Sequence, residues 1–538
     1  MVQATQQNQT LRSTAPAEIC PAFFSHARRS PDKPAIQCGH TVMTYQQLAQ
    51  LVARWSNAMA AHGVARGDHI AVILPNSIEF VALILVAADL GAVLIPLSGT
   101  LTACDMFKAF GATDVKHVVA TASLLQKLLH DSTGRENRVD GLWLSVDDPV
   151  HDDSVHHVKT LTGLLQDVSA DVAPLNAGTA DDALILSMTS GSTGDPKPII
   201  LTQRTKFNRV TAAVALYAIT DNDRVLAATP LYHSLAERLV LIPLLTGGTS
   251  ILMQRFSSKS WLRAVREHGV SFSIAVSSQL KQIASELNDA TGSADIASLR
   301  CIVSSSALLD PETKAELLRK FACEFHECYG ASEIAIASNL DDRSARIKLK
   351  SVGKAAPGVA IKIIGKNGEA LGAGEAGEIA CKTPMLFGGY FKRPDLTRLA
   401  MWGEYFRTGD IGRLDDDGFL FFLGRSKDII ITGGINVYPS DIESVVNEHP
   451  SVLESAAFSY PDEHLGEVVA VALVAADDAG FDLRKLRFHC CEHLADFQQP
   501  RKFFVTSALP KNSMGKLMKF RLAELYAGRP AETARLDQ

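Results

Sequence analysis

The segment "TSGSTGDPK" at residues 189–197 combines small hydroxyl-bearing residues and glycines with a final lysine. Glycines allow a backbone to approach a ligand closely, and exposed N–H groups, hydroxyls and an ammonium group together suit a polyanion. The segment differs from a Walker A loop, which has four residues between its first glycine and Gly-Lys and is followed by a helix. A surface turn is the alternative, because such residues are common in loops. We interpret the segment as a cradle for phosphate groups.

The segment "CYGASE" at residues 328–333 follows a strand-like stretch and places an aromatic ring next to a glycine. Tyr329 beside Gly330 can stack on a flat base. Glu333 can hold a hard cation such as Mg²⁺, which prefers oxygen ligands and usually bridges to substrate phosphates. The alternative for these residues is a strand end that carries a surface glutamate.

The segments "YFRTGD" and "IGRLDDDGFLFFLGR" together cover residues 405–425 and predict a hairpin whose turn is "DDDG". Asp410 and Arg425 flank this hairpin, which could hold both residues over one site. A carboxylate can accept hydrogen bonds from both hydroxyls of a ribose, and an arginine can support the same sugar or a phosphate. The alternative is a charged hairpin stem.

The segment "LPKNSMGKLMK" at residues 509–519 predicts a turn that presents Lys516 near the C-terminus. The spacing from Ser513 to Lys516 also fits a serine–lysine nucleophile pair, but the partner motifs of that chemistry are absent from the sequence. The alternative is an ordinary lysine in the tail of the chain.

Alternating apolar strands and helices must position these segments. The series begins with a helix at residues 48–63, a strand at 68–76, a buried helix at 77–91 and a strand at 92–97. The alternation returns at residues 182–188, 224–230, 237–253, 271–277 and 299–306. Such alternation predicts a parallel sheet. From about residue 351, short strands separated by glycine-rich turns predict antiparallel structure instead.

The composition limits the function classes. A chain of 538 residues is too long for one ordinary core, so we expect two or more domains. A net charge of −6 provides no overall attraction to nucleic acid or anionic lipid. Nine scattered cysteines favour a reducing compartment. The N-terminal residues lack the apolar core of a signal peptide, and the longest apolar run, residues 80–88, is too short to span a bilayer. We therefore expect a cytoplasmic protein with no transmembrane segment.

The four segments, in this order, resemble the motifs of the adenylate-forming superfamily, which includes acyl-CoA synthetases, nonribosomal adenylation domains and luciferases. The stretch "LSMTSGSTGDPK" is similar to its phosphate-loop pattern, and "YGASE" is similar to its Tyr-Gly-x-Thr-Glu motif with serine in place of threonine. The stretches "RTGD" and "GRSKDIIITGGINVYPSDIE" and the Pro-Lys-x-x-x-Gly-Lys ending also fit. The resemblance covers residues 20–525.

The resemblance implies an α/β fold with a large N-terminal domain of two doubly wound α/β subdomains plus a distorted β-barrel. A small, mobile α+β C-terminal domain would follow. We expect a disordered tail at residues 1–18, an AMP-binding domain at 19–424 and a C-terminal lid domain at 425–538, with a hinge near Lys427. Such enzymes join a carboxylic acid to the α-phosphate of ATP, release pyrophosphate and then pass the acyl group to a thiol.

The resemblance also implies roles for individual residues. The β- and γ-phosphates would be held by Thr189, Ser190, Gly191, Ser192, Thr193, Gly194 and Lys197. The remaining nucleotide-site residues would be Tyr329 and Gly330 at the adenine, Asp410 and Arg425 at the ribose, Ser332 at the α-phosphate and Glu333 at Mg²⁺.

Lys516 would have the central chemical role, because its ammonium group would offset the repulsion between the carboxylate and the phosphate. Rotation about Lys427 would withdraw this lysine for the second half-reaction. Gly433 and Gly434 would then line the tunnel for the pantetheine arm, where a Cβ would crowd the thiol. The acceptor would be CoA or the phosphopantetheine of a separate carrier protein.

Two features concern the pocket for the small-molecule carboxylic acid. His233 is similar to the family's aromatic or histidine gate, with a satisfied core histidine as the alternative. Family members usually read Ser-Gly-Gly-Ala-Pro-Leu where this chain reads "SSSALL". The resemblance implies that Ser304, Ser305 and Ser306 form the floor between the adenine and the acyl pocket, with Ser305 and Ser306 in place of two glycines. This difference suggests a shallower or more polar pocket and leaves the identity of the acid open.

Two catalytic interpretations follow. The first is an acyl-CoA synthetase, and the second is a stand-alone adenylation enzyme that loads an acyl or aminoacyl group onto a separate carrier protein. No carrier attachment motif is visible in the sequence. Enzymes that activate α-amino acids usually have Asp after an aromatic residue where this chain has His233 or Ser234, which argues modestly against an α-amino acid as the substrate. A non-catalytic nucleotide-binding relative conflicts with the joint presence of Lys516, Glu333 and Asp410.

Overall fold

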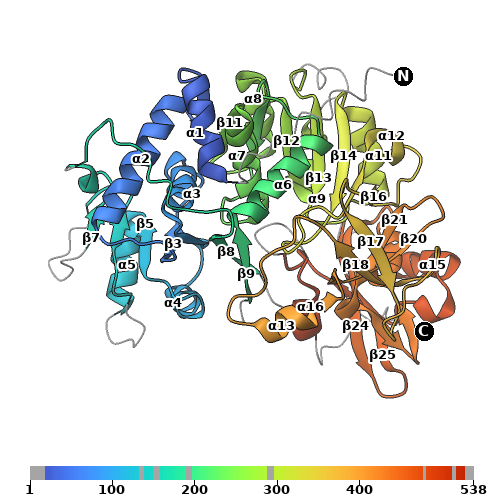
Figure 1. Ribbon diagram of the computed structural model, residues 1–538. Coiled ribbons are helices and arrows are strands. Elements are labelled where there is room, and N and C mark those ends of the chain that lie inside the picture. The colour runs from blue at the N-terminus through green and yellow to red at the C-terminus, as the bar shows by residue number, and fades with distance from the viewer. Residues whose placement is uncertain are drawn as a thin grey trace. The chain divides into compact units, whose positions relative to one another are not determined.

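The computed structural model describes residues 18–132, 139–149, 158–166, 168–189, 197–287, 296–476, 480–511 and 517–526 (Figure 1). Helices and strands alternate along the chain, which divides into two compact units. The first unit comprises Met1–Ser273 with Pro384–Pro394, and the second comprises Ile274–Thr383 with Asp395–Gln538. The domain boundary expected at residue 425 lies inside the second unit and stays a prediction.

A strand–helix–strand segment forms in the first unit where the alternation predicts one. Strands β3 (His69–Ile73) and β4 (Val93–Pro96) pair in parallel, and helix α3 (Ile78–Leu90) connects them. The Ser77 hydroxyl accepts a hydrogen bond at the start of the helix, and Gly91 ends the helix with a φ of 73°. The longest apolar run of the chain is therefore a buried helix, as predicted.

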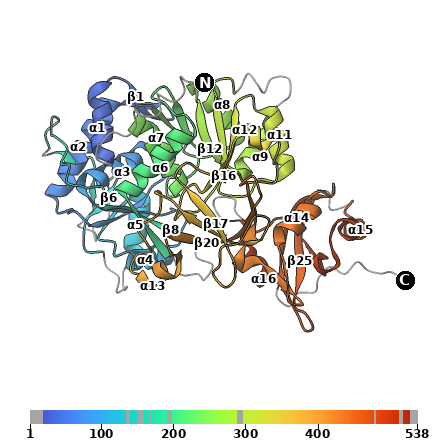
Figure 2. The same cartoon turned by 45° about the vertical axis from the view of Figure 1, so that its right-hand side comes forward.

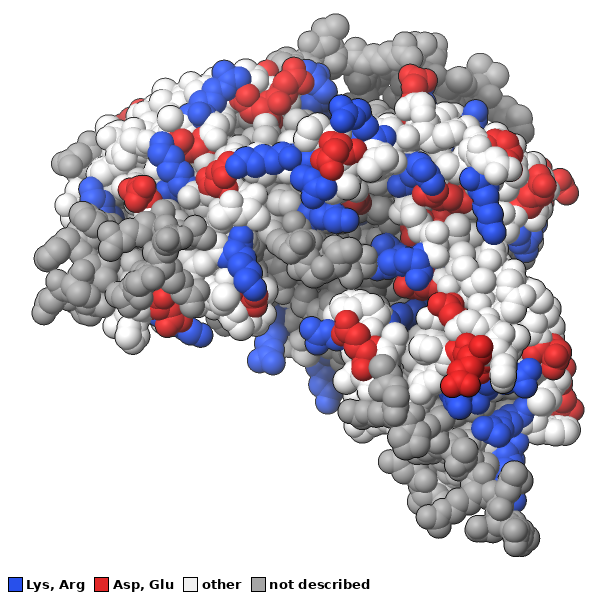
Figure 3. Space-filling view, turned by 90° about the horizontal axis from the view of Figure 1, so that it is seen from below, with Lys and Arg blue, Asp and Glu red and all other residues white. Residues whose placement is uncertain are grey.

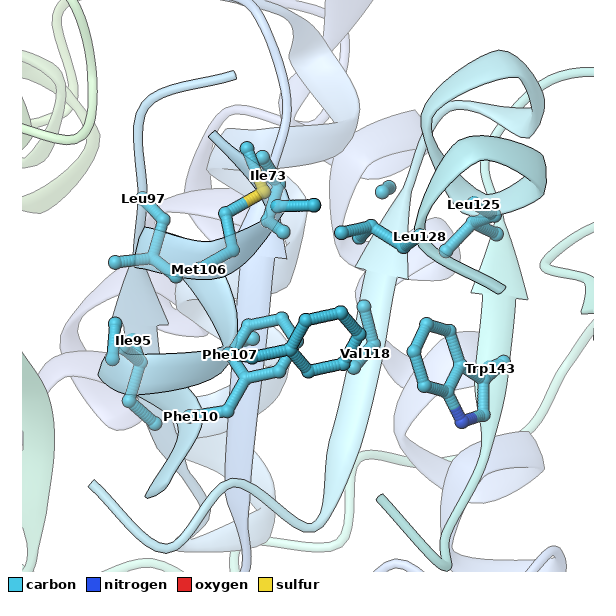
Figure 4. Close-up of a cluster of buried hydrophobic side chains, with 14 of the residues drawn as sticks. Ile73, Ile95, Leu97, Met106, Phe107, Phe110, Val118, Leu125, Leu128 and Trp143 are labelled. Carbon is cyan, nitrogen blue, oxygen red and sulfur yellow. The ribbon is translucent and has the colours of Figure 1, made fainter. Parts of the chain in front are cut away.

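This segment belongs to a seven-stranded sheet with the order β7-β6-β5-β3-β4-β8-β9. All neighbours pair in parallel except β9, which is antiparallel to β8. Its further elements are α4 (Ala103–Ala112), β5 (His117–Ala120), α5 (Ala122–Ser132), β6 (Trp143–Ser145), β7 (Val158–Thr160), β8 (Ala183–Thr189) and β9 (Lys197–Thr202). Figure 4 shows Phe107, Phe110 and Trp143 in the core between sheet and helices. Burying each such side chain stabilises this layer by about 1.5–3 kcal/mol.

A second group of strands has the order β12-β10-β11-β1-β2, of which only β2 is antiparallel to its neighbour, and the first unit ends within β12 at Ser273. The Tyr45 hydroxyl, at the start of α2 (Tyr45–Ala61), donates hydrogen bonds to the carbonyls of Pro243 in α7 (Ser234–Thr246) and of Gly248 just after it, at 3.0 and 2.9 Å. The elements are α1 (Ile19–Arg29), β1 (Pro34–Cys38), β2 (Thr41–Thr44), α2 (Tyr45–Ala61), a 3₁₀ turn (Gly163–Leu165), α6 (Gln203–Leu216), β10 (Arg224–Ala227), α7 (Ser234–Thr246), β11 (Thr249–Leu252), α8 (Ser258–His268) and β12 (Phe272–Val276).

The second unit begins with parallel strands and continues with antiparallel ones. Strands β13 and β14 pair in parallel, and β15 and β16 follow in antiparallel order. These elements are α9 (Ser277–Glu286), β13 (Cys301–Ser305), α11 (Pro311–Lys320), β14 (Glu324–Tyr329), β15 (Ser338–Leu340), α12 (Asp342–Ala345) and β16 (Lys354–Ala355).

An antiparallel five-stranded sheet follows, as the turn-rich sequence after residue 351 predicts. Its order is β17-β18-β20-β19, with β21 also paired to β20. The elements are β17 (Ala360–Ile364), β18 (Gly377–Lys382), α13 (Pro394–Leu399), β19 (Met401–Trp402), β20 (Tyr405–Leu414) and β21 (Leu420–Arg425).

The last strands form another five-stranded sheet, whose two faces are both covered by helices (Figure 2). Val469 and Val471 of β25 pack with helices α14 and α15, whereas Ala470 and Ala472 pack on the other face with α16. Its order is β23-β22-β25-β24, with β26 paired to β25. The elements are a 3₁₀ turn (Ser426–Asp428), β22 (Ile430–Thr432), β23 (Ile435–Val437), α14 (Pro439–Asn447), β24 (Val452–Asp462), β25 (Gly466–Ala475), α15 (Leu483–His493), a 3₁₀ turn (Asp496–Gln498), β26 (Lys502–Val505) and α16 (Lys519–Tyr526).

Charged side chains of both signs are interspersed over the face seen in Figure 3. This distribution accords with the small net charge of −6 for 538 residues. Within the described ranges, no helix combines the length and the apolar character needed to cross a membrane.

Candidate active site

The hairpin predicted at residues 405–425 forms and brings two predicted site residues together. Asp410 of β20 lies opposite Arg425 of β21 in the antiparallel register. Arg425 Nε is 3.2 Å from Asp410 Oδ1, and the side chains of Asp410 and Arg425 are 3% and 39% exposed, respectively. The guanidinium therefore balances the charge of a carboxylate that is almost completely buried.

A bulge in β20 orients Asp410. The register between β18 and β20 shifts at this point, and Gly409 has a φ of 70°. Glu378 Oε1 accepts a hydrogen bond from the Gly409 N–H at 3.1 Å, and the Thr408 hydroxyl donates one to the Ile379 carbonyl at 2.8 Å. Bulges redirect side chains and are common next to active sites. Glu378 thus supports the site, although the motif "RTGD" does not reveal it.

Tyr329, the last residue of β14, joins this pair. Its hydroxyl donates a hydrogen bond to Asp410 Oδ2 at 2.7 Å, and its ring centroid lies 5.8 Å from that of Phe422. Burial raises the pKa of the Tyr329 phenol well above its ordinary value, and the negative charge of Asp410 raises it further. The phenol therefore stays protonated and acts as a donor. Tyr329, Asp410 and Arg425 form one group, which we call the hairpin triad.

A tight turn after β14 carries Ser332 and Glu333. Ser332 is exposed and Glu333 is half-buried. Ala335 closes the turn with a φ of 59°, and a Cβ added to Gly330 would lie only 1.7 Å from the Ala335 carbonyl oxygen. Glycine at position 330 is therefore required by the close approach of the backbone.

Gly330→Ala is expected to lower the free energy of unfolding by at least about 1–3 kcal/mol, because the backbone of the turn must shift to admit the methyl group. We also expect weaker nucleotide binding, since Tyr329 and Glu333 border this turn. Thermal unfolding and calorimetric titration with AMP measure the two effects. Gly99→Ala is the matched control, because a Cβ at Gly99 meets no atom within 4 Å. Equal losses in both variants would contradict the explanation.

The three serines of the expected pocket floor lie at the end of β13. The buried Ser304 Oγ has no hydrogen-bond partner among the described residues, and Ser305 Oγ accepts a hydrogen bond from Cys328 Sγ at 3.2 Å. Ser306 has a φ of 76°. This left-handed conformation costs a residue with a Cβ about 1–2 kcal/mol. Glycine adopts this conformation without strain, which explains why the family pattern has a glycine at this position. This chain adopts the same conformation with a serine.

The first unit holds the two ends of the predicted phosphate loop. Thr189 at the end of β8 and Lys197 at the start of β9 are antiparallel partners. The residues between them, including the predicted ligands Ser190, Gly191, Ser192, Thr193 and Gly194, lie outside the described ranges. A strand follows the loop, in agreement with the distinction from a Walker A motif.

His233 immediately precedes helix α7 in the first unit. Its ring centroid lies 4.5 Å from that of Tyr232. Burial lowers the pKa of the imidazole from 6.5 to about 4. The side chain is therefore neutral at neutral pH and can both donate and accept a hydrogen bond.

This pKa is expected to make the protein less stable as the pH falls from 6.5 to about 4. In that range the unfolded chain binds a proton at His233 and the folded chain does not, so protons favour unfolding, by at most about 1.4 kcal/mol per pH unit. Urea unfolding at stepped pH should give a shallower dependence for His233→Asn. His40→Asn, at an exposed histidine, is the control. An unaltered dependence in the His233 variant would contradict the effect of burial.

The hinge and tunnel residues predicted at the C-terminal side lie in the second unit. Gly433 and Gly434 connect the paired residues Thr432 and Ile435, with φ values of 55° and 83°. Two positive φ values are typical of a type I′ turn in a two-residue hairpin, and glycines adopt them without strain. Lys427 lies in the 3₁₀ turn after β21.

Lys516 lies outside the described residues. Lys511 and Leu517 on either side of its segment form an antiparallel bridge. The role expected for Lys516 therefore stays a prediction, which a variant can test directly.

The hairpin triad presents a carboxylate whose orientation is set by a phenol and a guanidinium. A carboxylate offers about four lone-pair positions, which is enough for these contacts and for the neighbouring hydroxyls of a sugar. The oxygen ligand of Glu333 suits Mg²⁺, because this cation prefers oxygen and the side chain is half-buried rather than sealed from solvent. The arrangement in the second unit is thus suited to bind the hydroxyls of a sugar and a hard cation.

Comparison with known proteins agrees with this chemistry. Residues 23–391 match the model of AMP-binding enzymes, and residues 441–516 match the C-terminal domain of AMP-binding enzymes. The chain is 30% identical over 492 residues to the long-chain-fatty-acid–CoA ligase FadD13 of Mycobacterium tuberculosis (strain CDC 1551 / Oshkosh), covering 90% of this chain and 93% of that protein.

Solved structures give the same result. The o-succinylbenzoate CoA synthetase MenE from Bacillus subtilis, in complex with the acyl-adenylate intermediate OSB-AMP, matches with 26% identity and a TM-score of 0.81, covering 93% of this chain and 97% of that chain. ATP-bound MatB from Rhodopseudomonas palustris matches with 26% identity and a TM-score of 0.84, covering 95% and 99%. The α/β fold with a large N-terminal and a C-terminal domain is confirmed, as is the resemblance to the adenylate-forming superfamily. The chain belongs to the family of AMP-binding enzymes.

Proposed function

We propose that the protein is an AMP-forming acid–thiol ligase that activates a carboxylic acid with ATP and transfers the acyl group to CoA. The observation that carries this proposal is the hairpin triad, in which the buried Asp410 lies against Tyr329 and Arg425 and is suited to bind a ribose. The relatives support the same chemistry, because one is named a CoA ligase and another was solved with an acyl-adenylate.

In the first half-reaction, a carboxylate oxygen of the acid attacks the α-phosphorus of ATP, and the bond to the pyrophosphate oxygen breaks. Asp410 binds the ribose hydroxyls, Tyr329 contacts the adenine, and the loop from Thr189 to Lys197 holds the β- and γ-phosphates. Lys516 places an ammonium group between the two reacting anions. Such a preorganised charge contributes about 3–4 kcal/mol to the stabilisation of a transition state.

Mg²⁺ would be held by Glu333 together with the phosphates. When bound, the cation neutralises charge on the phosphate oxygens. Ser332, exposed in the same turn, would contact the α-phosphate. The protein supplies the oxygen ligand and the orientation of the nucleotide.

In the second half-reaction, the thiol sulfur of CoA attacks the acyl carbonyl carbon, AMP leaves with its phosphate oxygen, and the thiol proton passes to solvent. We propose that the domain after residue 425 rotates near Lys427 to withdraw Lys516 and to admit the pantetheine arm beside Gly433 and Gly434. A few hinge residues can absorb a rotation of this kind.

CoA is the acceptor favoured over a carrier protein, because the names of both FadD13 and MenE state CoA. The same names state different acids, a long-chain fatty acid and o-succinylbenzoate. The proposal therefore extends to the class of small-molecule carboxylic acids. His233 and the serines at 304–306 are the residues that we expect to select among them.

Pyrophosphate release from the purified protein, measured over a panel of fatty, aryl and dicarboxylic acids with ATP, tests the first half-reaction. Addition of CoA to the active acids should then yield an acyl-CoA and AMP. Thioester formation on a phosphopantetheinylated carrier protein but not on CoA would overturn the choice of acceptor. Absence of acid-dependent pyrophosphate release across the panel would contradict the proposed activity.

A further inference from the structure

A buried ion pair involves β14, the strand that ends in Tyr329. Lys314 Nζ of helix α11 is 2.5 Å from Glu327 Oε2, and the two side chains are 1% and 3% exposed. Glu327 and Tyr329 are two residues apart on β14, so their side chains leave the same face of the sheet. The pair is therefore linked through the backbone of β14 to Tyr329, whose phenol orients Asp410.

Each partner also fixes backbone from another segment. Glu327 Oε1 accepts a hydrogen bond from the Leu309 N–H at 3.2 Å, which anchors the loop after the three serines. Lys314 Nζ donates to the carbonyls of Leu349 and Ser351, at 2.5 and 3.1 Å. The pair thus connects β14, helix α11, the serine loop and residues 349–351.

The segment held by Lys314 is hydrogen-bonded to the hairpin that carries Asp410 and Arg425. The Ser351 hydroxyl donates a hydrogen bond to the Leu420 carbonyl at 2.8 Å, and the Leu420 N–H donates one to the Gly353 carbonyl at 2.8 Å. Leu420 is the first residue of β21. A short chain of hydrogen bonds therefore runs from the ion pair to the turn end of the hairpin, where Leu420 pairs with Leu414.

Because the ion pair is buried, each of its two charges needs the other to compensate it. Burial raises the pKa of the Glu327 carboxyl, and the positive charge of Lys314 opposes that shift. Removing one partner leaves the other as an uncompensated buried charge, which is strongly unfavourable. The surrounding backbone must then move to admit water or to solvate the charge, and the elements that the pair connects must move with it.

We propose that Lys314 and Glu327 are positioning residues for nucleotide binding: together they set the positions of Tyr329 and of the β20–β21 hairpin relative to each other. The inference rests on the proposed function, because it takes the hairpin triad as the site of the adenosine moiety. The pair does not touch the nucleotide. Its effect on the reaction passes through Tyr329 and Asp410.

Three variants test the proposal in the full-length protein. Glu327→Gln and Lys314→Met each leave one buried charge, and the double variant Lys314→Met/Glu327→Gln leaves none. KM for ATP should rise by about tenfold or more in each single variant, because misplacement of positioning groups by an ångström can cost about 10²-fold. KM for the acid at saturating ATP should change much less. The Kd for AMP, measured by calorimetry, should rise in parallel with KM for ATP.

The double variant separates stability from positioning. It should regain unfolding temperature relative to the single variants, because no charge remains buried without a partner. It should keep a raised KM for ATP, because the donor to the Leu349 and Ser351 carbonyls is still missing.

Lys206→Met is the matched control. Lys206 Nζ is 2.5 Å from Glu237 Oε2 in the first unit, and those side chains are 1% and 0% exposed. This variant should lower the unfolding temperature as the single variants do, with KM for ATP and Kd for AMP unchanged. Equal changes of KM for ATP in Lys206→Met and Glu327→Gln, or unchanged AMP binding in Glu327→Gln, would overturn the proposal.

Failure of the proposed function has a different signature. Wild-type protein that binds AMP but releases no pyrophosphate with any acid would contradict the proposed reaction and leave the AMP titrations of the variants as the test of positioning. Wild-type protein that does not bind AMP would overturn both.

Discussion

Lys516→Ala is expected to reduce acid-dependent pyrophosphate release by about 10²–10³-fold, because one preorganised charge between two reacting anions contributes about 3–4 kcal/mol. The same variant should still convert a supplied acyl-adenylate and CoA into acyl-CoA at a rate near that of the wild type. This second reaction no longer brings a carboxylate and a phosphate together. Quenched-flow measurement of each half-reaction separately gives the two rates.

Lys511→Ala is the matched control for this experiment. Lys511 lies in the same C-terminal segment and forms an ion pair with Glu454. Its removal should leave both half-reactions unchanged, apart from a small loss of stability of the kind typical of surface ion pairs. Equal loss of both half-reactions in Lys516→Ala would contradict the separation of roles, and retention of both would remove Lys516 from the mechanism.

Asp410→Asn is expected to lower kcat/KM for ATP by about 10²-fold, because hydrogen bonds to a charged acceptor contribute about 1.5–3 kcal/mol. The amide retains the shape of the side chain but removes the charge that faces Arg425, and it exchanges one acceptor for a donor. Most of the loss should appear as a higher KM for ATP. Steady-state kinetics at saturating acid and CoA would measure it.

The ribose contact has a specific signature. Wild-type protein should discriminate against 2′-deoxy-ATP and 3′-deoxy-ATP, and Asp410→Asn should discriminate much less, since the lost hydrogen bonds are those made by these hydroxyls. Asp417→Asn, at the exposed turn of the same hairpin, serves as the control and should retain the wild-type preference. Undiminished discrimination in Asp410→Asn would exclude this carboxylate as the ribose ligand.

The order and spacing of short motifs by themselves determined the family and the class of chemistry. Apolar periodicity also determined the strand–helix–strand segment around α3 and the antiparallel character after residue 351. The "DDDG" turn was sufficient to predict a hairpin that carries Asp410 and Arg425, but the register shift between Ile411 and Gly412 places them opposite each other. These features depend on local chain geometry, which neighbouring residues encode.

Only the tertiary structure decided how the site is oriented and supported. Glu378 accepts a hydrogen bond at the bulge that directs Asp410, and Glu327, on the strand that carries Tyr329, pairs with Lys314 of a separate element. Ser306 likewise adopts a left-handed backbone conformation, which its residue type does not predict. Contacts between distant segments have no local periodicity, and a buried charge looks the same in a sequence as an exposed one. Burial and long-range pairing therefore became visible only when the chain was folded.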